Sequence, residues 1–264
     1  MINHNFIIGP SDTDSISFCK ADMSPFTIEE QKFLLDEINE ISPEFMDWED
    51  DGMYKSCIAL RAKNYVLYDG EKKSTKGSAF KTSTKEIALK EFMQELVDEM
   101  LNDNNIQTLI NIYHKYIKEA LNVKDIHRWS SKKTITEAIL DCKSSPDESR
   151  KNEIDVWNAI KEESDIQEGT KFYVYPVVIG NHVESGRLGK TGKPLKDKVT
   201  EISGLRLEKY WKNDHNVDKL IERVYATLKI FKLVLDLSKF IDYSASKNKH
   251  LLQQELISSE INSN

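Results

Sequence analysis

The stretch that decides the fold class is Phe6-Ile-Ile-Gly-Pro-Ser-Asp-Thr-Asp-Ser-Ile-Ser-Phe18. Its two apolar ends, separated by polar turn residues, predict a β-hairpin with the polar residues at its tip. The following segment predicts a helix over residues 27–41, because Thr27 and Glu30 form a capping-box pattern and apolar residues then recur at helical spacing. This part of the chain is therefore predicted to mix α and β structure.

Further elements continue the mixed pattern along the chain. Strands are predicted over 53–60, 65–68 and 171–179, with a turn at Asp69-Gly70 and a loop over 186–198. Helices are predicted over 84–101, 106–121, 134–140, 153–163 and 217–240. The helix over 84–101 should bury one stripe of apolar side chains, which comprises Ile87, Leu89, Phe92, Leu96 and Met100. The predicted fold class is α+β.

The polar run Asn102-Asp-Asn-Asn105 predicts a domain boundary. The predicted first domain, residues 1–101, contains a partial antiparallel sheet with helices. The second domain, residues 102–245, is predicted to be mostly helical with a small β element, and residues 246–264 to form a flexible polar tail. A chain of 264 residues has room for one large domain or two modest ones.

The composition is typical of a globular protein with a heavily charged surface, since 39% of the residues are hydrophobic and 31% are charged. No stretch reaches the roughly 18 apolar residues of a membrane span, and the first residues lack the basic region of a secretory signal. We therefore expect no membrane partner and an intracellular location, such as the cytoplasm. Three widely spaced cysteines, Cys19, Cys57 and Cys142, indicate reduced thiols.

Charge is distributed unevenly along the chain, whose formal net charge is −7. Residues 1–54 hold two basic and thirteen acidic side chains, whereas residues 55–90 hold nine basic and three acidic ones. A second basic stretch over 171–212 has nine basic and four acidic side chains. Local clusters of Lys and Arg can contact a polyanion even when the whole chain is acidic. A solvated charged surface is the simpler interpretation of the same pattern.

Asp12-Thr-Asp-Ser15 is the sharpest local feature. Two carboxylates on a tight turn are held close together, as a hard cation such as Mg²⁺ requires, and such an ion shares its remaining positions with water and substrate phosphates. Aspartate is also common in turns for local hydrogen-bonding reasons alone, so the pair by itself does not establish a metal site. An EF-hand is excluded because the ligands and the glycine that its loop needs are absent.

Several other classes of site are excluded. Gly189-Lys-Thr191 is not part of a P-loop, because Glu184 occupies the place of the first glycine and its charge would repel phosphate. The six histidines are scattered without metal-ligand spacing. No serine elbow, Cys-His signature or dinucleotide fingerprint is present.

The basic segment after the predicted 53–60 strand contains Lys63-Asn-Tyr65, followed by Lys76-Gly-Ser-Ala-Phe-Lys81. Alternation along a strand places Lys63 and Tyr65 on the same side, so that a cation and a phenol hydroxyl can approach one ligand together. An ordinary strand with a surface lysine explains the same residues.

These motifs, in this order, resemble the family B DNA polymerases. Asp12-Thr-Asp-Ser15 resembles the third polymerase motif, Lys63-Asn-Tyr65 the Lys-x-Tyr motif, and Lys76–Lys81 the segment that follows it. Later segments at Ser131–Thr134, Glu168–Lys171 and from Gly204 onward are similar to parts of the thumb. By this resemblance residues 1–101 would be the carboxy-terminal part of the palm and residues 102–245 the thumb.

The resemblance implies a role for each matching residue in two-metal nucleotidyl transfer. Asp14 would be a direct Mg²⁺ ligand and Asp12 its weaker companion, so both are the expected catalytic and metal-binding residues. Lys63 and Tyr65 would contact the minor groove near the primer terminus, where all base pairs share acceptors. The remaining expected DNA contacts are lysines: Lys76, Lys81, Lys132, Lys133 and the loop from Lys190 to Lys198.

The chain also departs from the family pattern. Pro10-Ser11 stands where the family has Tyr-Gly, and the 264 residues contain no first motif with its aspartate, no fingers helix and no exonuclease domain. Two Mg²⁺ ions need the missing aspartate as a ligand. The resemblance therefore implies a split or truncated polymerase that acts on primer–template DNA and deoxynucleoside triphosphates, together with a second chain that supplies the exonuclease, the fingers and the rest of the palm.

Two alternatives remain at this point. The first is a DNA-binding module or polymerase remnant without catalysis, whose salt-sensitive binding would not depend on Asp12, Asp14 or Mg²⁺. The second is an unrelated nucleotidyl or glycosyl transferase that uses the Asp-x-Asp pair, which would need a nucleotide-binding domain that the sequence does not contain.

Overall fold

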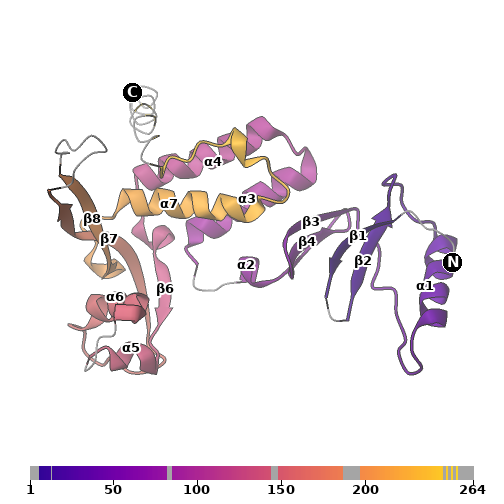
Figure 1. Ribbon diagram of the computed structural model, residues 1–264, viewed down its shortest axis with the longest axis horizontal. Helices are drawn as coiled ribbons and strands as arrows, with labels where there is room; N and C mark the ends of the chain where they lie inside the picture. The colour runs from indigo at the N-terminus through magenta and orange to yellow at the C-terminus, as the bar shows by residue number, and fades with distance from the viewer. Residues whose placement is uncertain are drawn as a thin grey trace. The chain divides into compact units, whose positions relative to one another are not determined.

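The computed structural model describes residues 6–12, 14–81, 85–143, 148–186 and 197–245, together with residues 248, 251 and 254. Within these residues it contains three small antiparallel sheets and seven α-helices (Figure 1), which confirms the predicted α+β class. The chain forms two compact units. The first comprises residues 1–81 and 230–236, and the second comprises residues 82–229 and 237–264.

The first unit begins with the predicted hairpin, which is confirmed as β1 (Phe6–Ser11) paired with β2 (Ile16–Lys20). The predicted helix follows as α1 (Ile28–Ile41). Its N-cap, Thr27, accepts a hydrogen bond from the Glu30 amide, and the Glu30 carboxylate accepts one from the Thr27 amide. This reciprocal capping box satisfies two of the amides that a helix start leaves without partners, and it explains why the helix begins at this point.

A second sheet in this unit consists of β3 (Ser56–Arg61), β4 (Asn64–Tyr68) and β5 (Lys73–Lys76), with the short helix α2 (Ser78–Lys81) after it. The predicted strand from residue 53 therefore starts three residues later. Strand β5 was not predicted, because Lys-Ser-Thr-Lys has no apolar alternation and is extended only through its pairing with β4. Apolar side chains of β3 and β4 supply most of the buried core here, namely Ile58, Leu60, Val66 and Leu67.

The loop after β5 packs directly on the turn between β3 and β4. Gly77 has φ +99°, and a Cβ at this position would lie 2.3 Å from the Lys63 carbonyl oxygen and 2.4 Å from Asn64 Oδ1. The buried Asn64 amide completes the contact, because Oδ1 accepts from the Ala79 amide at 2.9 Å and Nδ2 donates to the Ala62 carbonyl at 3.0 Å. Only glycine combines this backbone conformation with this approach. We call the contact of Gly77 and Ala79 with Asn64 the glycine clasp.

The second unit contains a helical group built from α3 (Ile87–Asn102), α4 (Ile106–Leu121) and α7 (Val217–Leu228). Its interior is rich in rings, since Phe92, Tyr113, Tyr116 and Trp129 are all buried. On α3 the predicted stripe is confirmed for Leu89, Phe92 and Leu96. Ile87, in contrast, is exposed and Met100 half-buried, because they lie in the terminal turns of the helix. Thr84, the predicted first residue, lies outside the described residues.

The same unit contains the sheet β6 (Ser131–Thr134), β7 (Lys171–Glu184) and β8 (Lys198–Leu207), with α5 (Glu137–Asp141) and α6 (Lys151–Ile160) packed beside it. The predicted helix over 134–140 was wrong at its start, because Thr134 pairs with Lys171 in the sheet. The predicted helix over 153–163 runs instead from Lys151 to Ile160. Strand β8 was not predicted, because it is extended through its pairing with β7, which lies earlier in the chain.

The predicted long helix over 217–240 was also wrong. Helix α7 ends at Leu228, and short 3₁₀ turns follow at Lys229–Phe231 and Leu237–Lys239. Residues 230–236 belong to the first compact unit, whereas α7 belongs to the second. Helical periodicity over this stretch could not reveal that the chain passes from one unit to the other.

Two further predictions concern the chain as a whole. The predicted domains, 1–101 and 102–245, and the predicted tail over 246–264 stay a prediction. Helix α3 belongs to the second compact unit, but a compact unit is not the same as a domain. Among the described residues, no helix combines the length and apolar character that crossing a bilayer would require.

The glycine clasp predicts that Gly77→Ala destabilises the first unit by roughly 3 kcal/mol or more, because the new methyl group meets backbone atoms and φ becomes strained. Hydrogen exchange should therefore accelerate in peptides from β3 to β5 and stay unchanged in peptides from α4. Gly52→Ala is the matched control, since Gly52 also has positive φ but has no atom near the Cβ position. It should cost about 1 kcal/mol. Equal effects of the two substitutions would contradict the clasp.

His215 predicts a pH-dependent stability. Both of its ring nitrogens and the neighbouring Trp211 Nε1 are buried without a hydrogen-bond partner among the described residues. Burial lowers the pKa of His215, so the folded chain binds this proton less readily than the unfolded chain does. Its contribution to stability is present above about pH 6.5 and is lost as the pH falls through the lower folded-state pKa. His215→Gln should shrink the fall in melting temperature across that window, and an unchanged fall would contradict this.

Candidate functional site

The tip of the β1–β2 hairpin carries the two predicted carboxylates. Ser11 pairs with Ile16, and the Asp12 amide donates to the Ser15 carbonyl at 2.9 Å, so these residues close the end of the hairpin. Asp12 and Asp14 are both exposed, and Thr13 between them lies outside the described residues. The turn therefore presents its acidic side chains to solvent, as the sequence predicted.

Lys63 lies in the turn that joins β3 to β4 and not on a strand. It has φ +59° and follows Ala62 in the two-residue connection between the paired residues Arg61 and Asn64. The prediction that Lys63 and Tyr65 share one side of a strand was therefore wrong, because alternation does not extend through a left-handed turn residue. Lys63 points instead to the hairpin tip.

The structure brings Lys63 and Asp12 together, although about fifty residues separate them in the sequence. Lys63 Nζ lies 2.8 Å from Asp12 Oδ1, and both side chains are solvent-accessible, at 68% and 36% exposure. The hydrogen bond to Asp12 and the charge of Asp12 raise the pKa of Lys63, and the charge of Asp14 raises it further. Two carboxylates and one ammonium thus form a small charged corner, which we call the Asp-Lys corner.

The carboxylate oxygens of the Asp-Lys corner are suitable ligands for a magnesium ion, but they are too few for the predicted two-ion site. Carboxylate oxygens are the ligands that Mg²⁺ prefers, but two carboxylates cannot hold two such ions. The described residues contain no group of three or more His, Cys, Asp or Glu side chains arranged to hold a metal. Lys63 also competes for Asp12. Further ligands would have to come from outside the described residues, and the predicted two-ion site stays a prediction.

The other predicted residues of this unit lie on the β3–β4–β5 sheet and its continuation. Tyr65 is opposite Lys76 in the register of β4 and β5, so the two side chains are cross-strand neighbours. Tyr65 is 9% exposed, whereas Lys76 is exposed. Lys81 ends α2. The glycine clasp therefore joins the Lys63–Tyr65 and Lys76–Lys81 segments that the sequence had singled out separately.

Lys132 and Lys133 lie in the second unit, on β6. Lys132 pairs with Tyr173 and Lys133 pairs with Phe172, so consecutive lysines lie on opposite faces of the sheet. Both side chains are half-buried. They therefore cannot contact one phosphate backbone from the same face. The loop from Lys190 lies outside the described residues up to position 196, and Lys198 begins β8.

An exposed aromatic residue that was not predicted from the sequence, Tyr173, is the cross-strand neighbour of Lys132. Tyr173 is 39% exposed, and its ring centroid lies 5.0 Å from that of His127. His127 Nδ1 in turn lies 2.9 Å from a Glu208 carboxylate oxygen. An exposed ring next to a cation can stack on an unpaired base. The alternation of Phe172-Tyr-Val-Tyr175 along a strand was the signal that could have revealed this face.

Comparison with known proteins adds no family. No protein-family model matches the chain, and none of the curated protein sequences matches it significantly. The resemblance to family B DNA polymerases therefore rests on the motifs of this sequence and stays an interpretation.

The Asp-Lys corner predicts how the turn responds to a divalent cation. Lys63→Met removes the competing ammonium and leaves Asp12 and Asp14 in place, so the affinity for Mn²⁺, used in place of Mg²⁺, should rise roughly five-fold or more. The free Mn²⁺ signal in an electron paramagnetic resonance titration measures this affinity.

Lys55→Met is the matched control, because Lys55 is another exposed lysine of the same unit. It should leave the Mn²⁺ affinity unchanged. If Lys63→Met also leaves the affinity unchanged, the turn does not hold a cation through Asp12.

Proposed function

We propose that this chain supplies the carboxy-terminal palm and thumb portion of a DNA-directed DNA polymerase similar to family B. The observation that carries the proposal is the Asp-Lys corner, in which the acidic motif at Asp12 and Asp14 meets Lys63 of the second motif. The glycine clasp then joins the third matching segment to the second. Three separate stretches that resemble the family's motifs in order are thus neighbours in space.

In this proposal the residues of the chain have distinct tasks. Asp14, and more weakly Asp12, would hold Mg²⁺ together with ligands from elsewhere, and the bound ions would supply the charge that nucleotidyl transfer requires. Lys63 would be released from Asp12 when a cation enters, which frees its ammonium for a phosphate or a base edge. Lys76 lies beside Tyr65 for a contact with the duplex, and Lys132 contributes a phosphate contact from the second unit.

The proposal requires a second component that carries the remaining motifs, as a separate chain or as another part of a longer one. The first motif, the fingers and the exonuclease all lie outside these 264 residues. The β1–β2 hairpin supports such a component, because Ile7, Ile8 and Ile16 expose between 43% and 60% of their surface. Apolar side chains on a two-stranded sheet are typical of a surface that another polypeptide covers.

The test is primer extension by the complex that contains this chain. The tagged chain is purified from its source cells with whatever binds it, and a labelled primer–template is extended with Mg²⁺ and deoxynucleoside triphosphates. The complex should extend the primer, and Asp14→Asn should reduce the rate by about a hundredfold or more, because a metal ligand is lost. Asp165→Asn, at an exposed position of the second unit, should leave the rate unchanged. Full extension by Asp14→Asn would reject the catalytic role.

A second candidate function is a DNA-binding module without catalysis, and the Lys63–Asp12 ion pair favours it, since the pair neutralises one of the two carboxylates. The same materials separate the two functions. A binding module should retain duplex binding in Asp12→Asn and Asp14→Asn, show steep salt dependence and gain nothing from Mg²⁺. The polymerase portion should bind a primer–template more tightly when Mg²⁺ is present.

A further inference from the structure

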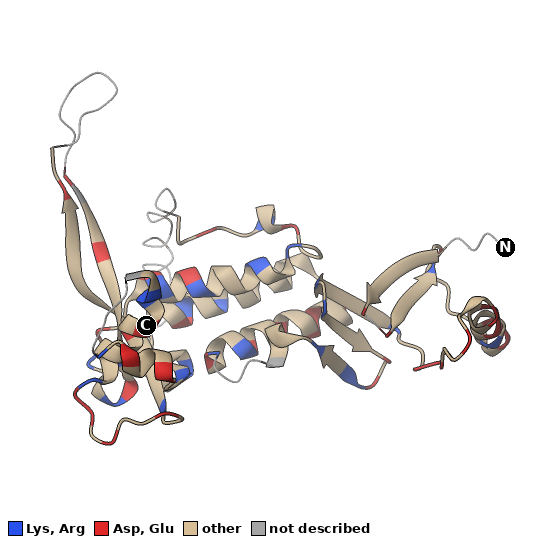
Figure 2. Ribbon diagram, turned by 60° about the horizontal axis from the view of Figure 1, so that its bottom comes forward, with Lys and Arg blue, Asp and Glu red and all other residues tan. Residues whose placement is uncertain are grey.

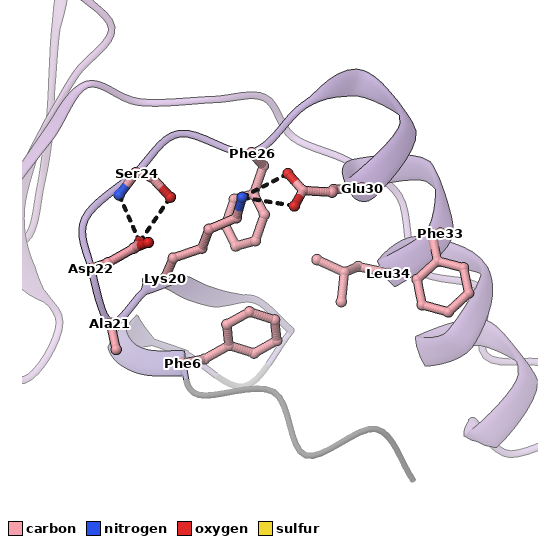
Figure 3. A pocket seen from close by; sticks show the side chains of 9 residues that line it. All are labelled: Phe6, Lys20, Ala21, Asp22, Ser24, Phe26, Glu30, Phe33 and Leu34. Atoms are coloured by element: carbon pink, nitrogen blue, oxygen red, sulfur yellow. Dashed lines mark hydrogen bonds and ion pairs between the residues drawn. The ribbon is translucent and has the colours of Figure 1, made fainter.

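A cavity of about 390 Å³ lies between the open end of the β1–β2 hairpin and the first turns of α1. Phe6 of β1 and Phe26 before α1 form two of its walls, and Phe33 and Leu34 of α1 form a third (Figure 3). Phe6 pairs with Lys20 at the hairpin end, whereas Asp12 lies beyond the other end of β1. The cavity is therefore separate from the Asp-Lys corner, and all of its lining belongs to the first compact unit.

The polar groups around this cavity already have partners. Lys20 Nζ lies 2.8 and 2.7 Å from the two Glu30 carboxylate oxygens and donates to the Pro25 carbonyl at 3.2 Å. Asp22 Oδ1 accepts from the amide and the hydroxyl of Ser24 at 2.9 and 2.8 Å. A polar small molecule would have to break these bonds to gain its own.

The contact surface that remains is apolar. Phe33 is 48% exposed although it faces the cavity, and the rings of Phe6 and Phe26 lie edge to face with centroids 5.7 Å apart. A ring-lined hollow of this size accepts an apolar side chain, such as leucine or phenylalanine, that a binding partner inserts.

The charge around the cavity identifies the partner. Residues 28–54, which are α1 and the segment after it, hold ten acidic side chains and one basic side chain, Lys32 (Figure 2). Exposed apolar residues alternate with these acids, and they include Ile28, Ile41, Phe45 and Met46. Nucleic acid and anionic lipid would be repelled by this surface, whereas lysine and arginine would be attracted.

We propose that this cavity is the docking site of a basic amphipathic protein segment, which inserts an apolar side chain between Phe6, Phe26 and Phe33 while its cations face the acids of residues 28–54. A helix with apolar residues at three- and four-residue spacing and lysines between them meets both requirements. The inference does not depend on the polymerase proposal, because neither the cavity nor the acidic segment includes a residue of the Asp-Lys corner.

The test uses a defined probe. A fluorescent amphipathic peptide of about 18 leucine and lysine residues is titrated with the full chain and followed by anisotropy, next to peptides with Glu for Lys and with Ala for Leu. The Leu/Lys peptide should bind, and both replacement peptides should bind at least about ten-fold more weakly. Phe33→Ser should weaken binding by a similar factor without a change of charge. Ile106→Ser, at an exposed apolar position of the second unit, should change it less than about two-fold.

A second measurement avoids any change in the protein. A photo-reactive phenylalanine replaces one leucine of the peptide, and the cross-linked residues of the unaltered chain are identified by mass spectrometry. Cross-links within residues 6–34 support the docking site. Three results would each overturn the proposal. The first is equal binding of the Glu-containing peptide. The others are an unchanged affinity of folded Phe33→Ser and cross-links confined to residues outside 6–34, both of which would indicate adhesion to the acidic surface alone.

Discussion

The candidate site depends on one close backbone approach, that of Gly77 to the Lys63–Asn64 peptide. Any side chain at position 77 would overlap the Lys63 carbonyl. The buried Asn64 side-chain amide accepts a hydrogen bond from Ala79 of the loop and donates one to Ala62 of the turn. The clasp fixes the β3–β4 turn in a left-handed conformation. Lys63 is thereby held where its ammonium reaches Asp12, so a constraint on the loop after β5 determines a contact of the β1–β2 turn.

The ion pair of the Asp-Lys corner is weak, so Asp12 and Lys63 can each exchange the other for a different partner. Its ion pair is exposed, and exposed pairs contribute little to stability because water screens them. In the proposed function, a divalent cation would displace the ammonium at small cost, and the released lysine would then be available to an anion. The two carboxylates by themselves also make a poor metal site, because they leave most coordination positions of the ion open.

The two ends of the hairpin serve different chemistry. The tip presents Asp12 and Asp14 next to a lysine, whereas the open end presents aromatic rings beside a strongly acidic segment. The acidic segment beside the open end repels a polyanion and attracts a basic protein segment. In our two proposals, the hairpin tip takes part in nucleotidyl transfer and the open end docks a basic protein segment.

The sequence by itself determined the features that arise from neighbouring residues: the hairpin around Asp12, the capping box of Thr27 and Glu30, and the buried stripe of Leu89, Phe92 and Leu96. Turn chemistry, capping and periodicity act over a few residues, so they can be read without a fold. The tertiary structure decided what depends on distant segments: the turn position of Lys63, the opposite faces of Lys132 and Lys133, and the strands β5 and β8, which exist only through pairing. Their energy comes from contacts across the chain, which local patterns do not contain.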